Sequence, residues 1–457
     1  MADAAALLQR AIALREVQDL GGALDAIRDA ARLAPNDPNT ALGLAQISFE
    51  AGLEAADFYA RAADLAPQRI DLQRSRATAL AAEGRHAEGE AVLEAVLVAN
   101  PGWIDGHRSL CGMRATAGDA DFARSFIPAI ERDPGNFGLR MAWFHILATA
   151  REWDDARAVI ADAEAHLGER QASLLGKLFI ASESGEGEDD PALFDGVEQI
   201  EDVGLDLARV RHFLRGGQVE RARSVCLKHA GRPAMRAFWS YLSLTWRLLG
   251  DARADWLDGG MRDVRSFDLD FSAGELVELA ATLRRLHTMQ QPWHEQSVRG
   301  GTQTERPLLL RIDPVIAGAR VKIERAVRAY IDELPAADPA HPLLAAPRGP
   351  FLFAGSWSVR LRPGGFHAMH THPMGWISSA LYVTVPAIDQ LGAPPAGRLQ
   401  FGAPPPELKL PLESYGHVVP VPGRLALFPS TMWHGTAPFT DGERMTIAFD
   451  VIPSTRP

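Results

Sequence analysis

The chain has 457 residues, which is long enough for two or three domains, each with its own packed interior. Its net charge of −11 argues against a nucleic-acid-binding protein and against attachment to anionic membranes, since both need clustered lysine and arginine. Two widely separated cysteines indicate neither a disulfide framework nor a zinc site, and the lack of a membrane span or signal peptide predicts a cytoplasmic protein.

The first third of the chain carries an internal repeat. Prolines that end predicted helices recur at a nearly constant interval, and small or apolar residues precede each proline with spacings of four and three. Such spacings place the residues on one helical face, where they allow a neighbouring helix to approach closely. The sets are Ala23, Ile27, Ala30 and Pro35; Ala55, Tyr59, Ala62 and Pro67; Gly89, Leu93, Val96 and Pro101; Phe122, Phe126, Ala129 and Pro134; and Ala156, Ile160, Ala163 and Gly168.

This period and these offsets resemble the tetratricopeptide repeat (TPR), in which paired helices stack into a superhelix with a concave face. The resemblance predicts a TPR array over residues 1–168. Beyond it, residues 169–258 are expected to hold degenerate helical repeats that close the solenoid. The concave groove is expected to bind a protein or peptide; the alternative is a surface that packs within the protein or forms a homodimer.

From residue 259 onward the pattern changes, and residues 259–457 are expected to form one further domain. Two predicted helices flank a segment rich in Gly, Thr and Gln (294–314), which suggests a shaped loop. From residue 351 the period becomes two, and short alternating runs are separated by Gly and Pro turns. This pattern predicts an antiparallel barrel or a double-sheet jelly roll, so the fold class expected for the chain is multidomain α + β.

Three histidines stand close together in the run FHAMHTHPMGWISSALYVTVP (366–386). Residues i and i+2 of a strand share a face, so His370 and His372 are expected to point to one common centre. His434, in PSTMWHGTAPF, starts another predicted strand and supplies a third imidazole. Three protein ligands on one side of a metal leave positions open for substrate and O₂, as non-haem Fe(II) oxygenases require. His367 is offset by three from His370, which predicts the opposite face of the strand.

Two further residues near the carboxyl end suit the recognition of an organic acid. Arg444 follows His434 by ten residues and opens the run RMTIAF. An arginine holds a carboxylate through two parallel hydrogen bonds and keeps its charge. Thr446 lies two residues on, hence on the same strand face, and adds a hydroxyl donor.

With these residues in place, the chain resembles the 2-oxoglutarate-dependent Fe(II) oxygenases, in which a His-x-acid pair and a distal His bind iron. An arginine about ten residues after that distal His binds the far carboxylate of 2-oxoglutarate. The runs QSVRGGTQT, SWSVRL, HTHPMGWISSALYV and LFPSTMWHGTAPF carry a closer likeness to a branch of this family over residues 290–455. The resemblance implies a double-stranded β-helix (jelly roll) with flanking helices, Fe(II) and 2-oxoglutarate as cofactors, and oxidative decarboxylation.

The chain departs from the family at one ligand, because His372 stands where the usual carboxylate is expected. Three neutral imidazoles leave the iron site one unit more positive, and trihistidine sites also occur in thiol dioxygenases that use no 2-oxoglutarate. A 2-oxoglutarate-independent, cupin-like dioxygenase is therefore an alternative, and His367 or Asp450 is an alternative ligand.

Four other residues are candidates for the pocket. Tyr382 and Ser378, on the strand after the histidine pair, could hydrogen-bond 2-oxoglutarate, although core packing and sheet pairing also suit them. Arg360 and Arg362 share a strand face and are candidates for the substrate side.

The function expected from these residues is an Fe(II)- and 2-oxoglutarate-dependent hydroxylase. Its substrate would be a protein or peptide side chain recruited by the TPR groove. A scaffold whose barrel has lost catalysis is the alternative from another functional class.

Overall fold

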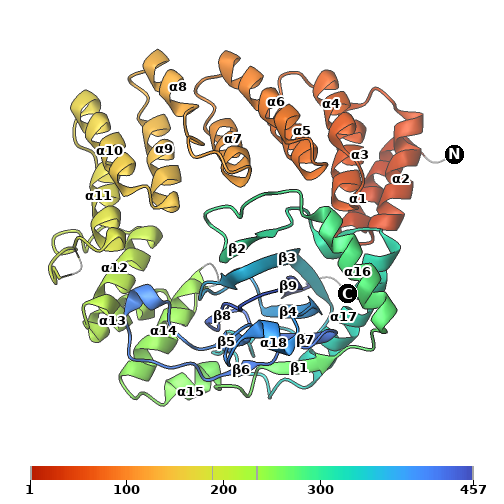
Figure 1. The fold of residues 1–457 in the computed structure, drawn as a ribbon. Coiled ribbons are helices and arrows are strands. Elements are labelled where there is room, and N and C mark those ends of the chain that lie inside the picture. The colour runs from red at the N-terminus through yellow and green to blue at the C-terminus, as the bar shows by residue number, and fades with distance from the viewer. Residues whose placement is uncertain (1–2, 188, 233–234, 455–457) are drawn as a thin grey trace.

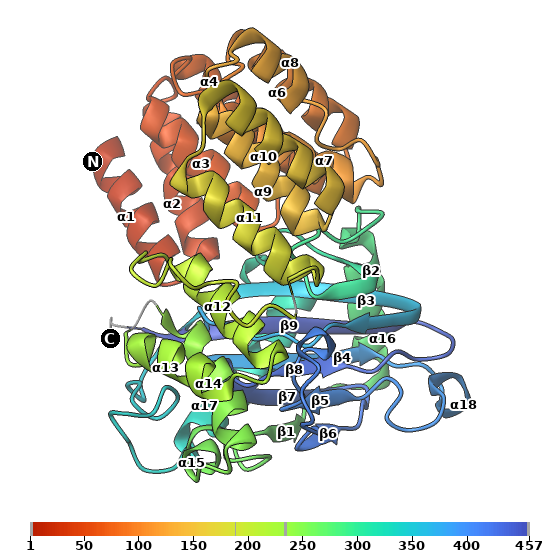
Figure 2. The ribbon, with the colours of Figure 1, turned by 90° about the vertical axis from the view of Figure 1, so that its left-hand side faces the viewer.

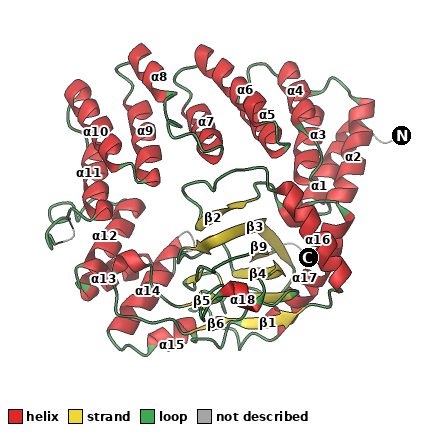
Figure 3. Cartoon of the chain, viewed as in Figure 1, coloured by secondary structure: helices red, strands yellow, loops and turns green. Residues whose placement is uncertain are grey.

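The computed structural model of the protein describes residues 3–187, 189–232 and 235–454. The amino-terminal part is helical, and antiparallel sheets with long flanking helices make up the rest (Figure 3). In Figure 1 the amino-terminal helices form an arc that curves over the sheets. These helices are α1 (Ala4–Glu16), α2 (Leu20–Leu33), α3 (Pro38–Glu50), α4 (Ala56–Leu65), α5 (Asp71–Ala82), α6 (His86–Ala99), α7 (Ile104–Thr116), α8 (Phe126–Arg132), α9 (Phe137–Ala150), α10 (Trp153–Leu167), α11 (Gln171–Ser184), α12 (Val203–Arg215), α13 (Val219–His229), α14 (Ala237–Leu248) and α15 (Arg253–Asp258).

The repeat prolines mark helix ends. Helices α2, α4, α6 and α8 each end two residues before one of the four prolines, because the proline ring cannot continue the helix. After the first of them, the Asp37 carboxylate accepts a hydrogen bond from the Thr40 amide at 2.8 Å and caps α3. The same turn therefore ends one helix and starts the next.

The small residues of the repeats pack between helices. Ala23, Ile27 and Ala30 are all fully buried. The other repeats carry a larger residue at the position of Gly89, and packing against α5 explains why this one has glycine. A Cβ atom there would lie 2.9 Å from the Ala77 carbonyl oxygen on α5, a contact that only glycine avoids.

The sheets are antiparallel throughout. The larger has the strand order β1-β7-β4-β9-β3-β2, and the smaller has the order β6-β5-β8. The segment after residue 294, expected to be a shaped loop without regular structure, contains a strand, β2, with a register shift near Gly300. The strands are β1 (Arg265–Asp268), β2 (Val298–Gln303), β3 (Phe351–His367), β4 (Ile377–Thr384), β5 (Leu399–Phe401), β6 (Gly416–Val418), β7 (Arg424–Pro429), β8 (His434–Thr436) and β9 (Arg444–Pro453).

Strand β9 shows how the period of two sorts its residues. Met445, Ile447, Phe449 and Val451 are fully buried in the main core, which helices α16 (Ala273–Leu286) and α17 (Pro314–Asp332) cover. The alternate positions of the strand, which start at Arg444, point to the other face of the large sheet. That face lies opposite the smaller sheet and holds the candidate site.

The array touches the sheet-bearing part near both of its ends. Near the amino terminus, the Gln18 side-chain amide donates to the Phe353 carbonyl at 2.8 Å and accepts from the Phe353 amide at 3.1 Å. Near α14, the Ser240 hydroxyl donates to the Thr431 carbonyl at 2.7 Å, and the Trp433 indole donates to the Ser240 carbonyl at 2.9 Å. Figure 2 shows α12 and α14 lying over the sheets.

Arg306 joins the two parts in the middle of this interface. It is 7% exposed, donates to the Leu53 carbonyl at 2.7 Å, and lies over the Phe49 ring at 4.5 Å. Replacing Arg306 with alanine should cost about 3 kcal/mol, because it leaves buried carbonyl groups unpaired. We expect the melting temperature to fall by several degrees. The melting temperature of Arg306→Lys, which keeps the charge, should fall less. Equal melting temperatures for the wild type and both variants would show that Arg306 does not stabilise this interface.

No helix in the described ranges is both long and apolar enough to cross a membrane. The division of the chain at residues 168 and 258 stays a prediction.

Candidate metal centre

The three predicted histidines meet. His370 and His372 follow the end of β3, and His434 opens β8. The His370 amide donates to the His434 carbonyl at 2.9 Å, and the reverse bond is 3.0 Å long, so the two residues form a short antiparallel bridge. One ligand atom of each ring lies within 4.8 Å of those of the other two. The pair expected on one strand thus lies just beyond its end, where His370 pairs with His434 and the His372 amide donates to the Ser430 carbonyl at 2.9 Å.

Each imidazole is oriented through its Nδ1 atom. Nδ1–H of His370 donates to the Ala368 carbonyl at 2.7 Å, and that of His434 donates to the Met432 carbonyl at 2.9 Å. A carbonyl oxygen only accepts, so in both rings Nδ1 carries the proton. Nε2 is therefore the unprotonated nitrogen of both rings, the arrangement in which a second contact fixes the tautomer of a metal-binding histidine.

His372 is held differently, by a carboxylate. Its Nδ1–H lies 2.8 and 2.7 Å from the two oxygens of Asp450 on β9. The Ser378 hydroxyl donates to Asp450 at 2.5 Å and lies 2.8 Å from the Ser430 hydroxyl. Asp450, which the sequence offered as an alternative ligand, therefore contacts His372 through Nδ1 and is not part of the cluster of potential ligands. A carboxylate in this position makes the imidazole a more basic ligand.

His367 lies in the same cavity, contrary to the opposite face expected from its offset. Its ring lies 6.0 Å from that of His370, and the Ser297 hydroxyl lies 3.1 Å from His367 Nδ1 and 3.2 Å from His370 Nε2. The expectation assumed a continuous strand, but β3 ends at His367 and the chain changes direction there. The cluster of potential ligands found in the described residues comprises His370, His372 and His434 without it.

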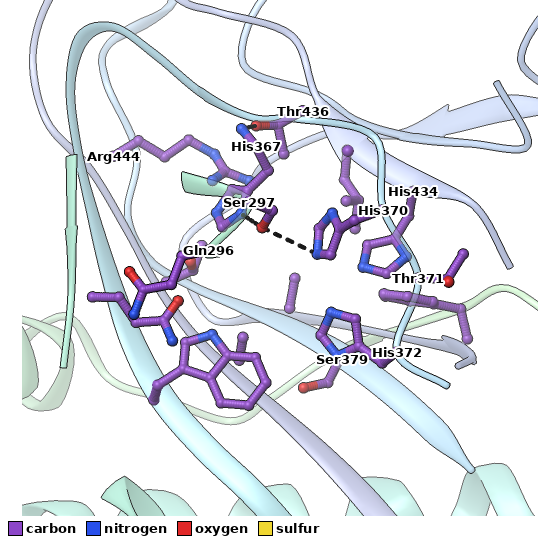
Figure 4. A pocket seen from close by; sticks show the side chains of 18 of the residues that line it. Gln296, Ser297, His367, His370, Thr371, His372, Ser379, His434, Thr436 and Arg444 are labelled. Atoms are coloured by element: carbon purple, nitrogen blue, oxygen red, sulfur yellow. Dashed lines mark hydrogen bonds between the residues drawn. The ribbon is translucent and has the colours of Figure 1, made fainter. Parts of the chain in front are cut away.

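These histidines line a cavity of about 220 Å³, together with Arg444 and Thr446 (Figure 4). Burial, with a smaller effect of the neighbouring His372, lowers the pKa of His370 to about 3. Burial likewise lowers the pKa of His434 well below its usual value. Both imidazoles are therefore neutral near pH 7 and have a lone pair available, so three nitrogen donors suit a divalent transition metal such as iron.

Arg444 is a buried cation without a counter-charge. It is 2% exposed, and among the described residues it forms no ion pair. The Tyr382 ring lies 5.1 Å from its guanidinium carbon, and the Tyr382 hydroxyl and Arg444 Nε are buried without a hydrogen bond of good geometry. Burial lowers the pKa of Arg444, since an unpaired charge is costly away from water. A carboxylate of a bound acid would provide the missing partner.

The remaining candidates have other surroundings. Ser378 bonds Asp450 and does not line the cavity. Arg360 forms an ion pair with Glu443 at 2.5 Å, and Arg362 is exposed; neither lines the cavity. The structure therefore brings Arg444 and Thr446 to the histidines, with Tyr382 beside Arg444, but not the two arginines of β3.

Several lining residues escaped the sequence analysis. Gln296 and Ser297 come from the segment before β2, and Trp357 stacks on His372 with ring centroids 5.7 Å apart. The motif QSVRGGTQT contained the first two, but nothing in its spacing indicated that it reaches the histidines.

Comparisons with known proteins agree with this site. Residues 355–450, which include the three histidines and Arg444, match the family described as "Putative 2OG-Fe(II) oxygenase". Fe(II) and 2-oxoglutarate, the cofactors for which this family is named, are those predicted from the sequence, so that prediction is confirmed at the level of the family. The search of curated proteins found no match.

Solved structures similar to this chain fall into two groups. A Pseudomonas putida prolyl-4-hydroxylase has 17% identity and a TM-score of 0.29 over 42% of this chain and 94% of its own. A collagen prolyl hydroxylase of Paramecium Bursaria Chlorella virus-1, in complex with 2OG, has 15% identity and a TM-score of 0.28 over 42% and 96%. A Parabacteroides merdae tetratricopeptide repeat protein has 17% identity and a TM-score of 0.33 over 53% and 98%. Residues 355–450 therefore match the family that their motifs predicted, and the helices before them follow the predicted repeat period.

Proposed function

We propose that this protein is an Fe(II)- and 2-oxoglutarate-dependent oxygenase that hydroxylates a side chain of a protein or peptide. The unpaired Arg444 beside a cluster of three histidines carries the proposal. This combination suits a ligand that is an acid at one end and chelates a metal at the other, as 2-oxoglutarate does.

We further infer that the two antiparallel sheets form the double-stranded β-helix implied by the family. The large sheet carries Arg444 and Asp450 on β9, and the small sheet carries His434 on β8. Residues from both sheets then converge on the space between them, where a jelly roll holds its ligands.

In this proposal Nε2 of His370, His372 and His434 hold Fe(II), and Arg444 holds the far carboxylate of 2-oxoglutarate. Thr446 adds a hydroxyl on the same strand face. When bound, the iron and 2-oxoglutarate supply oxidative decarboxylation with O₂, which gives succinate and CO₂ and transfers one oxygen atom to a C–H bond of the substrate. The contacts of Nδ1 fix the rings before metal binds, and the walls of the cavity limit the access of water.

The scaffold and the 2-oxoglutarate-independent dioxygenase remain the competing functions. Burial of an uncompensated arginine disfavours the scaffold, because a scaffold requires no anion at that position. A pure scaffold should also purify without stoichiometric iron.

The direct test supplies full-length protein with Fe(II), 2-oxoglutarate and O₂ and measures succinate, which such oxygenases also release slowly without substrate. We expect succinate from the wild type and its loss in His434→Ala, since two imidazoles hold iron weakly. His166→Ala is the matched control, because His166 lies on the exposed surface of α10 and should leave turnover unchanged. No succinate from iron-loaded wild type, or equal turnover in His434→Ala, would refute the proposal.

A further inference from the structure

A second hollow lies between the array and the sheet-bearing part. It measures about 470 Å³ and has one wall from α5 and α7 and the other from residues 293–305. Arg74, Thr78 and Arg108 lie on the array side, and Trp293 and Glu305 lie on the other. We call this hollow the interface groove.

The interface groove adjoins the metal cavity. Glu295 and Gln296 line both spaces, so a strip of two residues separates them. A chain lying in the groove has one of its side chains next to Glu295 and Gln296, which also line the metal cavity. The array itself thus forms part of the approach to the proposed iron site.

The groove is formed before any ligand binds, because its two walls are bonded to each other. The amides of Gln290 and Gln291 both donate to the Thr116 carbonyl at the end of α7, at 3.1 Å. The neighbouring His294 ring packs on Phe122 with centroids 5.1 Å apart. A preformed site avoids the entropic cost of ordering its walls on binding.

The array wall carries polar side chains beside the apolar Ala81, Met113 and Ile146. Asp105, Arg108, Ser109 and Thr116 lie along one face of α7 at helical spacing, and all of them line the groove. An extended segment brings an unpaired amide and carbonyl at every residue, and Arg108 and Ser109 can hydrogen-bond with them.

The opposite wall is acidic. Glu295 and Glu305 form no ion pair with any described residue, whereas Arg74 on the array wall is paired with Asp105 at 3.4 Å. The free carboxylates therefore favour a basic side chain on this wall, and Arg108 is left to donate to backbone carbonyls.

From these contacts we propose that the interface groove binds an extended polypeptide segment with a lysine or arginine placed against Glu295. A neighbouring residue of the segment then enters the metal cavity. This inference rests on the proposed function and names its substrate class.

The test uses fluorescent heptapeptide pools that are random except for a fixed central Lys, Arg, Gln or Glu. Their binding to full-length protein is measured by anisotropy without O₂. We expect the Lys and Arg pools to bind about tenfold more tightly than the Glu pool, and Glu295→Lys to reverse the order. Glu169→Lys, an exposed charge reversal after α10, should keep the wild-type order.

A second variant tests the location. Cys111 and Cys226 are fully buried, so Arg108→Cys adds a thiol that a bulky maleimide labels selectively. Labelling should abolish binding of the Lys pool, and labelled Glu169→Cys should bind it normally. Equal affinity for all pools, or undiminished binding to labelled Arg108→Cys, overturns the inference.

The two proposals fail separately. If the wild type releases succinate but shows no preference among the pools, the groove assignment alone is wrong. If it selects the basic pools yet produces no succinate with iron loaded, the groove assignment holds and the oxygenase function is wrong.

Discussion

Replacing Arg444 with methionine is expected to raise the Kd for 2-oxoglutarate by about 100- to 1,000-fold, the effect of removing one partner of a buried charge pair. The guanidinium is 2% exposed and has no carboxylate partner among the described residues, so its charge is left for a ligand. Calorimetric titration of Fe(II)-loaded protein with 2-oxoglutarate, without O₂, measures the change.

The same substitution should leave the stability of the ligand-free protein unchanged or raise it, since it removes an unpaired buried charge. Arg140 provides the matched control. It is also 2% exposed, but it donates to Asp162 at 2.7 Å and to the Pro134 carbonyl at 2.6 Å. Arg140→Met should therefore lose about 3 kcal/mol of stability without changing the Kd. The opposite pattern, a destabilised Arg444→Met with normal affinity, would make Arg444 a structural residue.

Replacing Asp450 with asparagine is expected to weaken Fe(II) binding by about 10- to 100-fold, the usual effect of losing a carboxylate behind a histidine ligand. Asparagine keeps the size and an acceptor for His372 Nδ1–H but removes the charge. The more positive site should also have a higher Fe(III)/Fe(II) reduction potential. Competition with a chelator measures the affinity, and a mediated redox titration measures the potential.

A double variant separates charge from packing at this position. His372→Asp alone places a second carboxylate beside Asp450, and the repulsion should weaken metal binding. Adding Asp450→Asn moves the single negative charge from behind the ligand to the ligand itself, so much of the affinity should return. Such non-additivity is the sign of direct coupling between the two residues. Wild-type affinity and potential in Asp450→Asn would limit Asp450 to packing.

The repeats were predictable because their determinants are local. A proline that ends each helix and small residues at spacings of four and three depend only on neighbouring units. The sequence also predicted that His370, His372 and His434 converge, although the pair lies just beyond the end of β3 rather than on it. The shared face of Arg444 and Thr446 was predictable, because the period of β9 fixes it.

The surroundings of these residues were not predictable, because they come from contacts between segments far apart in the sequence. Asp450 reaches His372 across 78 positions, and Arg306 reaches Leu53 across 253. His367 was misplaced because nothing in its neighbours shows that β3 ends there. The interface groove was not predictable either, because its acidic wall and the helices α5 and α7 opposite it come from distant parts of the sequence.

Anchoring of the array near both ends changes its mechanics. A free superhelix of repeats behaves as a spring, whose pitch stretches to fit partners of different size. Here Gln18 is hydrogen-bonded to β3 and Ser240 to the turn before β8, so the distance between the two ends of the arc is fixed. A fixed span limits how far the repeats can move apart to admit a partner.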